Sequence, residues 1–199
     1  MSAKRHNPAV TGSFREAIAA LSKVLVTKPN FGMIIGGIAV IARGVPRTTR
    51  DVDATVDGGA LSLEDLLEAF KRESIVPRID DVLVFARDNQ VLLLRHAPST
   101  MDIDVSIAWL PFELEAIAGC ETIWLGDLRV PVARPEDLLI YKTIAWRPQD
   151  QQDAERLLSL YGKHIDIDRV RQIVGEFAAV LEDSHRLEEL DRVIARTSS

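Results

Sequence analysis

The sequence predicts an α+β fold, in which a mixed β-sheet is flanked by helices and followed by a C-terminal helical bundle. Short apolar or alternating segments typical of strands occur at residues 31–35, 51–56 and 101–108. Amphipathic segments with helical spacing separate these strands, and from Pro135 onward the pattern is helical throughout. We therefore expect a core over residues 1–133 and a helical region over residues 134–199 that packs on the core.

The first part of the chain alternates between helices and strands. In order, we expect a helix over residues 13–25, a strand over 31–35, a break at Gly36 and Gly37, a helix over 38–44 and a strand over 51–56. The next helix has Ser62 as its N-cap and Asp65 at the capping-box position. Two hairpins are then expected, one pairing residues 81–86 with 90–96 and one pairing 121–125 with 128–133. Between them lie a strand over residues 101–108 and a short helix over 111–119.

The last third of the chain contains only helical patterns. Pro135 and Pro148 each lie in the first turn of a predicted helix, where a proline costs no hydrogen bond. The predicted helices cover residues 135–146, 148–162, 166–183 and 184–196.

Composition excludes several classes of protein. The 199 residues are 47% hydrophobic, enough for a sizeable core, and the net charge of −6 argues against extensive nucleic-acid binding. The single cysteine, Cys120, excludes an internal disulfide and fits a reducing cytoplasm. We see no signal peptide, and the most apolar run, residues 31–42, is too short to cross a bilayer. We expect a cytoplasmic protein with no membrane partner.

Two pairs of aspartates interrupt two of the predicted strands. Asp51 and Asp53 point to one face of their strand, and Asp102 and Asp104 do the same on a later strand. Neighbouring carboxylates repel one another unless a cation neutralises them, and Mg²⁺ suits this role because it takes oxygen ligands and bridges to phosphates. If the strands are adjacent, the carboxylates converge on a site for two metal ions. The alternative is two edge strands that each present a polar face.

A glycine pair precedes the first of these strands. Gly36 and Gly37 lie at a strand-to-helix turn, where backbone N–H groups can approach a phosphate closely. The alternative is a tight turn, and the spacing of a dinucleotide-binding fingerprint is missing. Arg43, Arg47 and Arg50 follow and could contact phosphates or RNA, although a loop of solvated arginines is the favoured interpretation for Arg43 and Arg50.

The stretch "GGIAVIARGVPRTTRDVDATV" resembles the signature of the polymerase-β-type nucleotidyltransferase superfamily. That signature consists of a glycine pair, a helix, Arg-x-Thr-x-Asp-x-Asp on a strand, and a third aspartate on a later strand. The matching residues are Gly36, Gly37, Arg47, Thr49, Asp51, Asp53 and Asp104. Asp102 competes with Asp104 for the third position, and we choose Asp104 because the apolar residues after it fit the family strand better.

A second stretch, "ARPEDLLIYKTIAWRPQDQQDAERL", resembles motifs of the AbiEii-like subgroup, which occurs among bacterial toxin–antitoxin and phage-defence proteins. The matching residues are Pro135, Glu136, Asp137, Leu138, Lys142, Arg147, Asp150 and Asp153. Small-molecule nucleotidyltransferases that modify aminoglycosides or lincosamides look similar too. Asp150 and Asp153 share one helix face, where they either position Lys142 or Arg147 or form a solvated surface.

The resemblance implies a Mg²⁺-dependent transfer of a nucleoside monophosphate from an NTP to a hydroxyl acceptor. Asp51, Asp53 and Asp104 would bind two Mg²⁺ ions, and Asp104 would act as, or orient, the base that deprotonates the acceptor. Gly36, Gly37, Arg47, Thr49 and Lys142 would bind the nucleotide. Asp102, Arg147, Asp150 and Asp153 would support the site.

The nature of the acceptor stays open at this point. It could be tRNA, another macromolecule or a small molecule, and an antitoxin protein is an expected partner if the chain is a toxin. Two further hypotheses are a catalytically silent member that binds a nucleotide or a partner protein, and a non-enzymatic interaction domain with incidental carboxylates.

Overall fold

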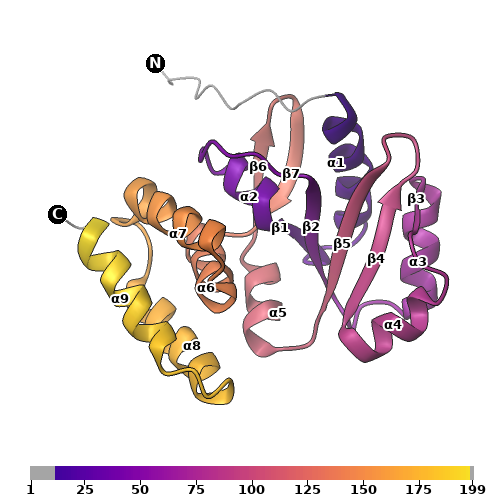
Figure 1. The fold of residues 1–199 in the computed structure, drawn as a ribbon. Coiled ribbons are helices and arrows are strands. Elements are labelled where there is room, and N and C mark those ends of the chain that lie inside the picture. The colour runs from indigo at the N-terminus through magenta and orange to yellow at the C-terminus, as the bar shows by residue number, and fades with distance from the viewer. Residues whose placement is uncertain (1–11, 198–199) are drawn as a thin grey trace. The chain divides into compact units, whose positions relative to one another are not determined.

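The computed structural model describes residues 12–197, which form a seven-stranded mixed sheet, its flanking helices and a helical C-terminal part (Figure 1). This architecture confirms the predicted fold class. The chain divides into two compact units, a sheet-containing unit that ends at Ala133 and a helical unit that begins at Arg134.

The sheet contains both parallel and antiparallel pairs. Its strands are β1 Gly32–Ile35, β2 Asp51–Asp57, β3 Ile75–Pro77, β4 Val91–His96, β5 Met101–Ala108, β6 Glu121–Leu125 and β7 Leu128–Val132. They are arranged in the order β3-β4-β5-β2-β1-β7-β6. The pairs β2–β5 and β1–β7 are parallel, and the other neighbours are antiparallel. The central pair β2–β5 is therefore the place where the two predicted aspartate pairs lie side by side.

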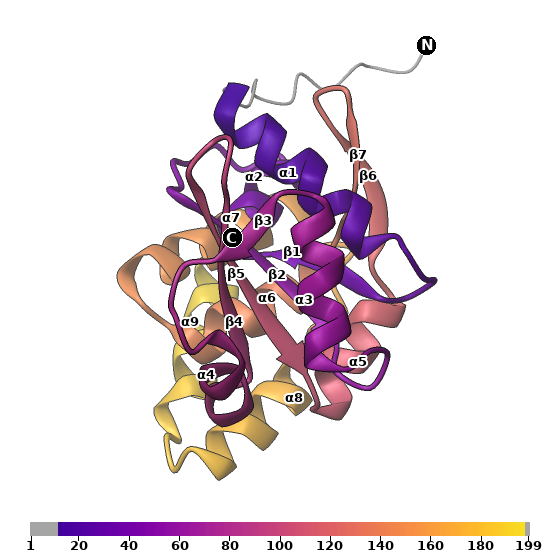
Figure 2. The ribbon, with the colours of Figure 1, turned by 90° about the vertical axis from the view of Figure 1, so that its right-hand side faces the viewer.

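Helices lie on both faces of this sheet. They are α1 Gly12–Leu25, α2 Gly36–Ala42, α3 Leu63–Arg72, α4 Val82–Asn89 and α5 Pro111–Ala118. Helices α1 and α3 lie on one face, and α2 and α5 on the other (Figures 1 and 2). The alternate residues Val52, Ala54 and Val56 of β2 are fully buried, as are Ile103 and Val105 of β5. Because successive side chains of a strand alternate, the aspartates occupy the face opposite to this apolar row.

The first predicted hairpin is wrong in one of its two arms. Residues 82–89 form α4 rather than a strand, with Val82 and Ala86 buried one helical turn apart and Val84 exposed. Gln90 ends the helix in the left-handed region at φ 55°, and β4 begins directly after it. Strand β4 instead pairs with β5 in an antiparallel hairpin, and the short strand β3, which the sequence did not indicate, pairs with the other edge of β4. A short apolar run is equally compatible with a strand and with a buried helix face, so periodicity alone could not decide.

Arg43 at the end of α2 fixes this helix to the sheet. Its guanidinium donates hydrogen bonds to the carbonyl of Ala133 at 2.7 Å and 3.0 Å and forms an ion pair with Glu121 at 2.6 Å. The residue is only 7% exposed. Arg43 is therefore neither a solvated arginine nor a phosphate ligand, and the sequence-based interpretation of this residue was wrong.

The helical unit contains four helices, α6 Pro135–Ala145, α7 Pro148–Tyr161, α8 Ile167–Val180 and α9 His185–Thr197. Buried Asp137 on α6 accepts hydrogen bonds from Arg134 at 2.8 Å and from Arg169 on α8 at 2.9 Å. This aspartate therefore joins the start of α6 to α8. Within residues 12–197, no helix has the length and apolar character needed to cross a membrane.

Candidate active site

Four aspartates form two rows on one face of the central parallel strand pair. The register places Asp51 beside Asp102 and Asp53 beside Asp104. Side chains of paired residues in adjacent strands point to the same face, so the structure brings together the two aspartate pairs that the sequence singled out. The alternative of two separate polar edge strands is wrong, because β2 and β5 are interior strands of the sheet.

The glycine pair covers one of these rows. Gly36 has φ +60°, and a Cβ atom at this position would lie 1.9 Å from Oδ2 of Asp53. A side chain at residue 36 would therefore collide with the Asp53 carboxylate as well as strain the backbone. Gly37 is similarly close to Thr49, whose Oγ1 would lie 2.6 Å from an added Cβ. The two glycines are needed because the backbone passes directly over the residues of the Arg-x-Thr-x-Asp-x-Asp motif.

The Arg-x-Thr part of the motif lies against the same turn. Thr49 donates a hydrogen bond from Oγ1 to Oδ1 of Asp51 at 2.9 Å, which fixes one carboxylate. The guanidinium carbon of Arg47 would lie 3.2 Å from a Cβ atom at Gly37, so this arginine borders the glycine turn. The spacing of the motif thus has a direct structural basis.

Two arginines that the sequence analysis did not single out bind the carboxylates of β5. Arg95 on β4 lies opposite Asp102 and donates from Nε to Oδ1 at 2.7 Å. Arg78, which follows β3, places Nη2 at 2.8 Å from Oδ1 of Asp104 and Nη1 at 3.7 Å from Oδ2 of Asp102. The hairpin register could have revealed Arg95, but Arg78 depends on β3, which was not predicted.

The two aspartates of β5 have environments that shift their pKa values in opposite directions. The hydrogen bond from Arg95 lowers the pKa of Asp102 below its ordinary value. Burial raises the pKa of Asp104, and the neighbouring charge of Asp51 adds to this effect against the opposing charge of Arg78. Asp104 is therefore the carboxyl group of this pair that binds a proton more readily.

The carboxylates suit a hard divalent cation in chemical type. Mg²⁺ prefers carboxylate oxygens, and the Asp51, Asp53 and Asp104 side chains occupy adjacent rows on one sheet face. Over residues 12–197, however, no three His, Cys, Asp or Glu side chains already converge closely enough to hold a metal ion. Binding would therefore require some rearrangement of these side chains. The donor set fits the cation in kind, and the register places the side chains next to one another.

Three predicted residues of the helical unit, Lys142, Asp150 and Asp153, form a buried cluster. Lys142 is 6% exposed, and its Nζ atom lies 2.8 Å from Oδ1 of Asp150 and 3.1 Å from Oδ2 of Asp153. Arg147 also donates to Asp150, from Nε to Oδ2 at 2.7 Å. Burial alone would raise the pKa of Asp150, but the hydrogen bonds and charges of Lys142 and Arg147 lower it overall. Asp150 and Asp153 thus hold Lys142, and the alternative of a solvated helix face is wrong.

The sequence model of one protein family, described as a nucleotidyltransferase of unknown function (DUF6036), matches residues 13–197. The chain belongs to this family. A solved structure from H. pylori, of a protein provisionally named a nucleotidyltransferase, matches this nucleotidyltransferase-family chain with a TM-score of 0.54 at 14% sequence identity. The match covers 96% of this chain and 98% of that chain, and it supports the fold alone. No curated protein matches the sequence.

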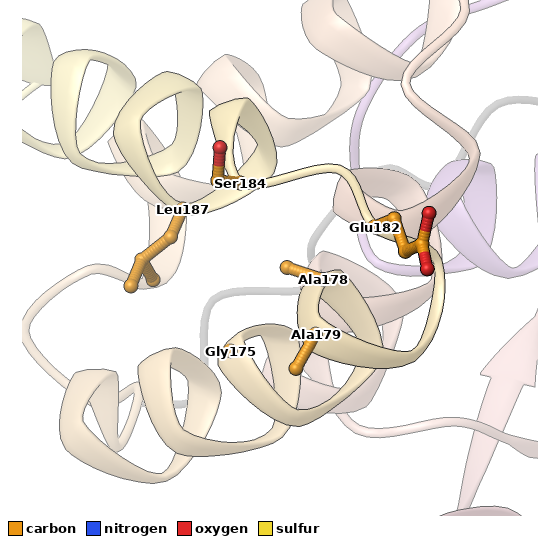
Figure 3. A pocket seen from close by; sticks show the side chains of 6 residues that line it. All are labelled: Gly175, Ala178, Ala179, Glu182, Ser184 and Leu187. Carbon is orange, nitrogen blue, oxygen red and sulfur yellow. The ribbon is translucent and has the colours of Figure 1, made fainter.

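One pocket of this nucleotidyltransferase-family chain is lined by none of the predicted site residues. It has a volume of about 410 Å³ and lies between α8 and α9, where Leu187 faces the small residues Gly175 and Ala178 (Figure 3). Among the described residues that line it, the only ionisable one is Glu182, which is unsuited to a phosphate. This pocket is therefore not a candidate for the nucleotide site.

Proposed function

We propose that this protein transfers a nucleoside monophosphate from an NTP to a hydroxyl acceptor. The observation that carries the proposal is the double row of carboxylates on β2 and β5, with the Gly36–Gly37 turn directly over Asp53. Membership of a nucleotidyltransferase family supports the same reaction class. The carboxylates supply ligands for a cation, and the turn brings backbone close to the place where phosphates would lie.

In this proposal Asp51, Asp53 and Asp104 hold Mg²⁺, with two ions as the expected number. Bound Mg²⁺ would neutralise the phosphate charge, orient the NTP and lower the pKa of the acceptor hydroxyl. Asp104 is chosen as the third carboxylate because both oxygens of Asp102 face guanidinium groups, those of Arg95 and Arg78, whereas only Oδ1 of Asp104 does. Thr49 keeps Asp51 in place through its hydroxyl.

The transfer is a single displacement at the α-phosphorus. The acceptor oxygen forms a bond to this phosphorus while the bond to the bridging oxygen of the β-phosphate breaks, and pyrophosphate leaves. Asp104 acts as, or helps to orient, the base that takes the proton of the acceptor hydroxyl. The backbone of Gly36 and Gly37, together with Arg47, binds the β- and γ-phosphates.

Lys142 is the residue of the helical unit that we propose to bind the nucleotide. Two of the three donors of its ammonium group face Asp150 and Asp153, and the third is the one that we propose to bind a phosphate oxygen. Asp150, Asp153 and Arg147 would then act by fixing the position of this charge.

We further propose that the chain is AbiEii-like and that its acceptor is tRNA or another macromolecule, with a possible antitoxin protein as partner. The motif from Pro135 to Asp153 supports the subgroup, and the exposed Arg50 beside the site supports an anionic acceptor. A small-molecule acceptor of the antibiotic type is the second candidate, which the similarity to aminoglycoside nucleotidyltransferases favours.

The experiment is transfer of label from each α-³²P-labelled NTP, with Mg²⁺, to total tRNA, to protein and to a panel of aminoglycosides. We expect one acceptor class to become labelled from α-labelled but not from γ-labelled nucleotide. Intact NTP binding without transfer to any acceptor would instead identify a catalytically silent member of the family.

Variants test the site assignment within this experiment. Asp51→Asn and Asp53→Asn should reduce transfer to background, because each removes a charge from the cation site. Asp88→Asn is the matched control, since Asp88 is an exposed aspartate of α4. Transfer that survives both Asp51→Asn and Asp53→Asn would contradict the assignment.

A further inference from the structure

The carboxylates of β5 take part in a series of side-chain contacts between alternating positive and negative groups, and the proposed reaction does not explain this series. The series of contacts leads from Arg95 to Asp102, then to Arg78 and finally to Asp104. It spans β4, β5 and the residue that follows β3, and all four residues belong to the sheet-containing unit. Opposite charges on adjacent strands, such as Arg95 and Asp102, stabilise a sheet. This stabilisation does not require Arg78 as a second arginine.

The position of Arg78 is set by the backbone. Its N–H donates to the carbonyl of Leu93 at 3.1 Å, and Leu93 is the register partner of Asp104. Arg78, Leu93, Asp104 and Asp53 therefore lie in one row across the sheet. The Arg78 side chain crosses over β4 along this row, and with 20% of it exposed it is largely removed from water.

Arg78 contacts only one of the two carboxylate oxygens of Asp104. Oδ1 is buried and lies 2.8 Å from Nη2 of Arg78, in an ion pair rather than a regular hydrogen bond. Oδ2 accepts no hydrogen bond from the residues between 12 and 197. A contact of this kind orients the carboxylate through one oxygen and leaves the other available to a ligand, which is how partners behind a metal-binding carboxylate act.

Asp102 has the opposite environment. Oδ1 accepts the hydrogen bond from Arg95 at 2.7 Å, and Oδ2 faces Nη1 of Arg78 at 3.7 Å. Both oxygens of this carboxylate are therefore directed at guanidinium groups. Asp102 is placed to hold Arg78, not to bind a cation.

We propose that Arg78 is a positioning residue for Asp104. It binds Oδ1 and so presents Oδ2 to the cation, while Asp102, which is itself held by Arg95, faces the guanidinium of Arg78. This inference rests on the proposed function, because it assumes that Asp104 is a cation ligand. It adds a residue outside the signature motif to the site and gives Asp102 a role distinct from that of Asp104.

The test is Mn²⁺ binding to the full-length protein by calorimetry, with an NTP present, for wild type, Arg78→Gln, Arg78→Lys and Arg87→Gln. Arg78→Gln should weaken Mn²⁺ binding by about 10–100-fold, the usual effect of losing a partner behind a ligand. Arg78→Lys keeps the charge with fewer donors and should give an intermediate loss. Arg87→Gln is the matched control, because Arg87 forms an ion pair with Glu64 in which both side chains are 56% exposed.

A second readout does not depend on the metal. In EDTA, the shifts in urea midpoint caused by Arg78→Gln and Asp104→Asn should be non-additive in the double variant, because each removes the same contact. Additive shifts would overturn the inference. So would unchanged or tighter Mn²⁺ binding by Arg78→Gln, since tighter binding means that Arg78 competes with the cation.

Failure of the proposed function has a different signature. Wild type and Arg87→Gln would then bind no Mn²⁺ with any NTP, and Asp51→Asn would change nothing. Failure of the inference alone leaves wild type, Arg87→Gln and Arg78→Gln with equal Mn²⁺ affinity. Circular dichroism of each variant, with Arg78→Lys as the milder change, separates loss of binding from loss of folding.

Discussion

Asp102 and Asp104 have the same chemical group, the same strand and the same face, yet opposite pKa shifts. The difference arises from their partners, since Arg95 favours the charged form of Asp102, whereas burial disfavours the charged form of Asp104. A carboxylate that destabilises the folded state but lies at a candidate active site is typical of a trade-off between stability and function.

Asp104→Asn should stabilise the protein by roughly 0.5 kcal/mol at pH 7 in EDTA, a small value because the group is one-third exposed and screened. The folded state binds the Asp104 proton more tightly than the unfolded chain does, so stability falls as the pH rises from the ordinary Asp pKa through the raised one. Wild type and variant should therefore converge at low pH. Urea unfolding from pH 3 to pH 7 measures this, and a variant less stable than wild type at pH 7 would contradict it.

Asp102→Asn is the matched control and should behave in the opposite sense. Its pKa is lowered by Arg95, so its stabilising effect is present above the ordinary Asp pKa and is lost as the pH falls through the lowered value. We expect a loss of less than about 1 kcal/mol at pH 7, as for other exposed ion pairs.

The site residues differ in how far the sequence alone could reveal them. Asp51 and Asp53 were found because an i, i+2 pair in an apolar strand is a local signal. Arg78 was missed because it reaches Asp104 only through the pairing of β3 with β4 and of β4 with β5. Local patterns show which residues share a face, whereas contacts across several strands depend on tertiary structure.

Among the elements, α2 shows how closely one helix is tied to the site. It begins at Gly36 over Asp53, and at its other end Arg43 binds the carbonyl of Ala133. The sequence located this helix from its apolar run and its glycines, but it placed the break at Gly36 and Gly37, which in fact form the first turn of the helix.

Gly36→Ala tests this arrangement against a control with almost the same backbone. Gly36 has φ +60° and Gly126 has φ +62°, but an added Cβ meets Asp53 only at Gly36 and meets nothing within 4 Å at Gly126. Gly126→Ala should cost only the left-handed backbone penalty, about 1–2 kcal/mol. Gly36→Ala should cost more and also reduce NTP transfer, as measured by urea unfolding and the labelled-nucleotide assay. Equal effects of the two substitutions would show that the contact with Asp53 does not matter.

At the scale of the whole molecule, the chain consists of a sheet-containing unit and a helical unit with a polar cluster of its own. In the helical unit, Lys142 neutralises Asp150 and Asp153, which are 2% and 0% exposed. The burial of Lys142 is therefore explained by these two ion pairs, whether or not the lysine also binds a nucleotide.

Lys142→Met should destabilise the protein by about 3–5 kcal/mol, because it leaves two buried carboxylates without their shared cation. Lys163→Met is the control, since Lys163 is exposed, and it should change stability by no more than about 0.5 kcal/mol. Urea unfolding, together with hydrogen exchange of the α6 and α7 amides, measures both effects. A Lys142→Met protein as stable as wild type would show that the cluster is not the main role of this lysine.

The parallel pairing of β2 with β5 has a consequence for the order of folding. Asp53 and Asp104 lie about fifty residues apart in the sequence, and only this pairing makes them neighbours. Pairings between distant segments form late and slowly, because the chain must close a long loop before the contact forms. We therefore expect the carboxylate site to be absent from a partly folded or newly synthesised chain, so the proposed transfer would begin only once folding is nearly complete.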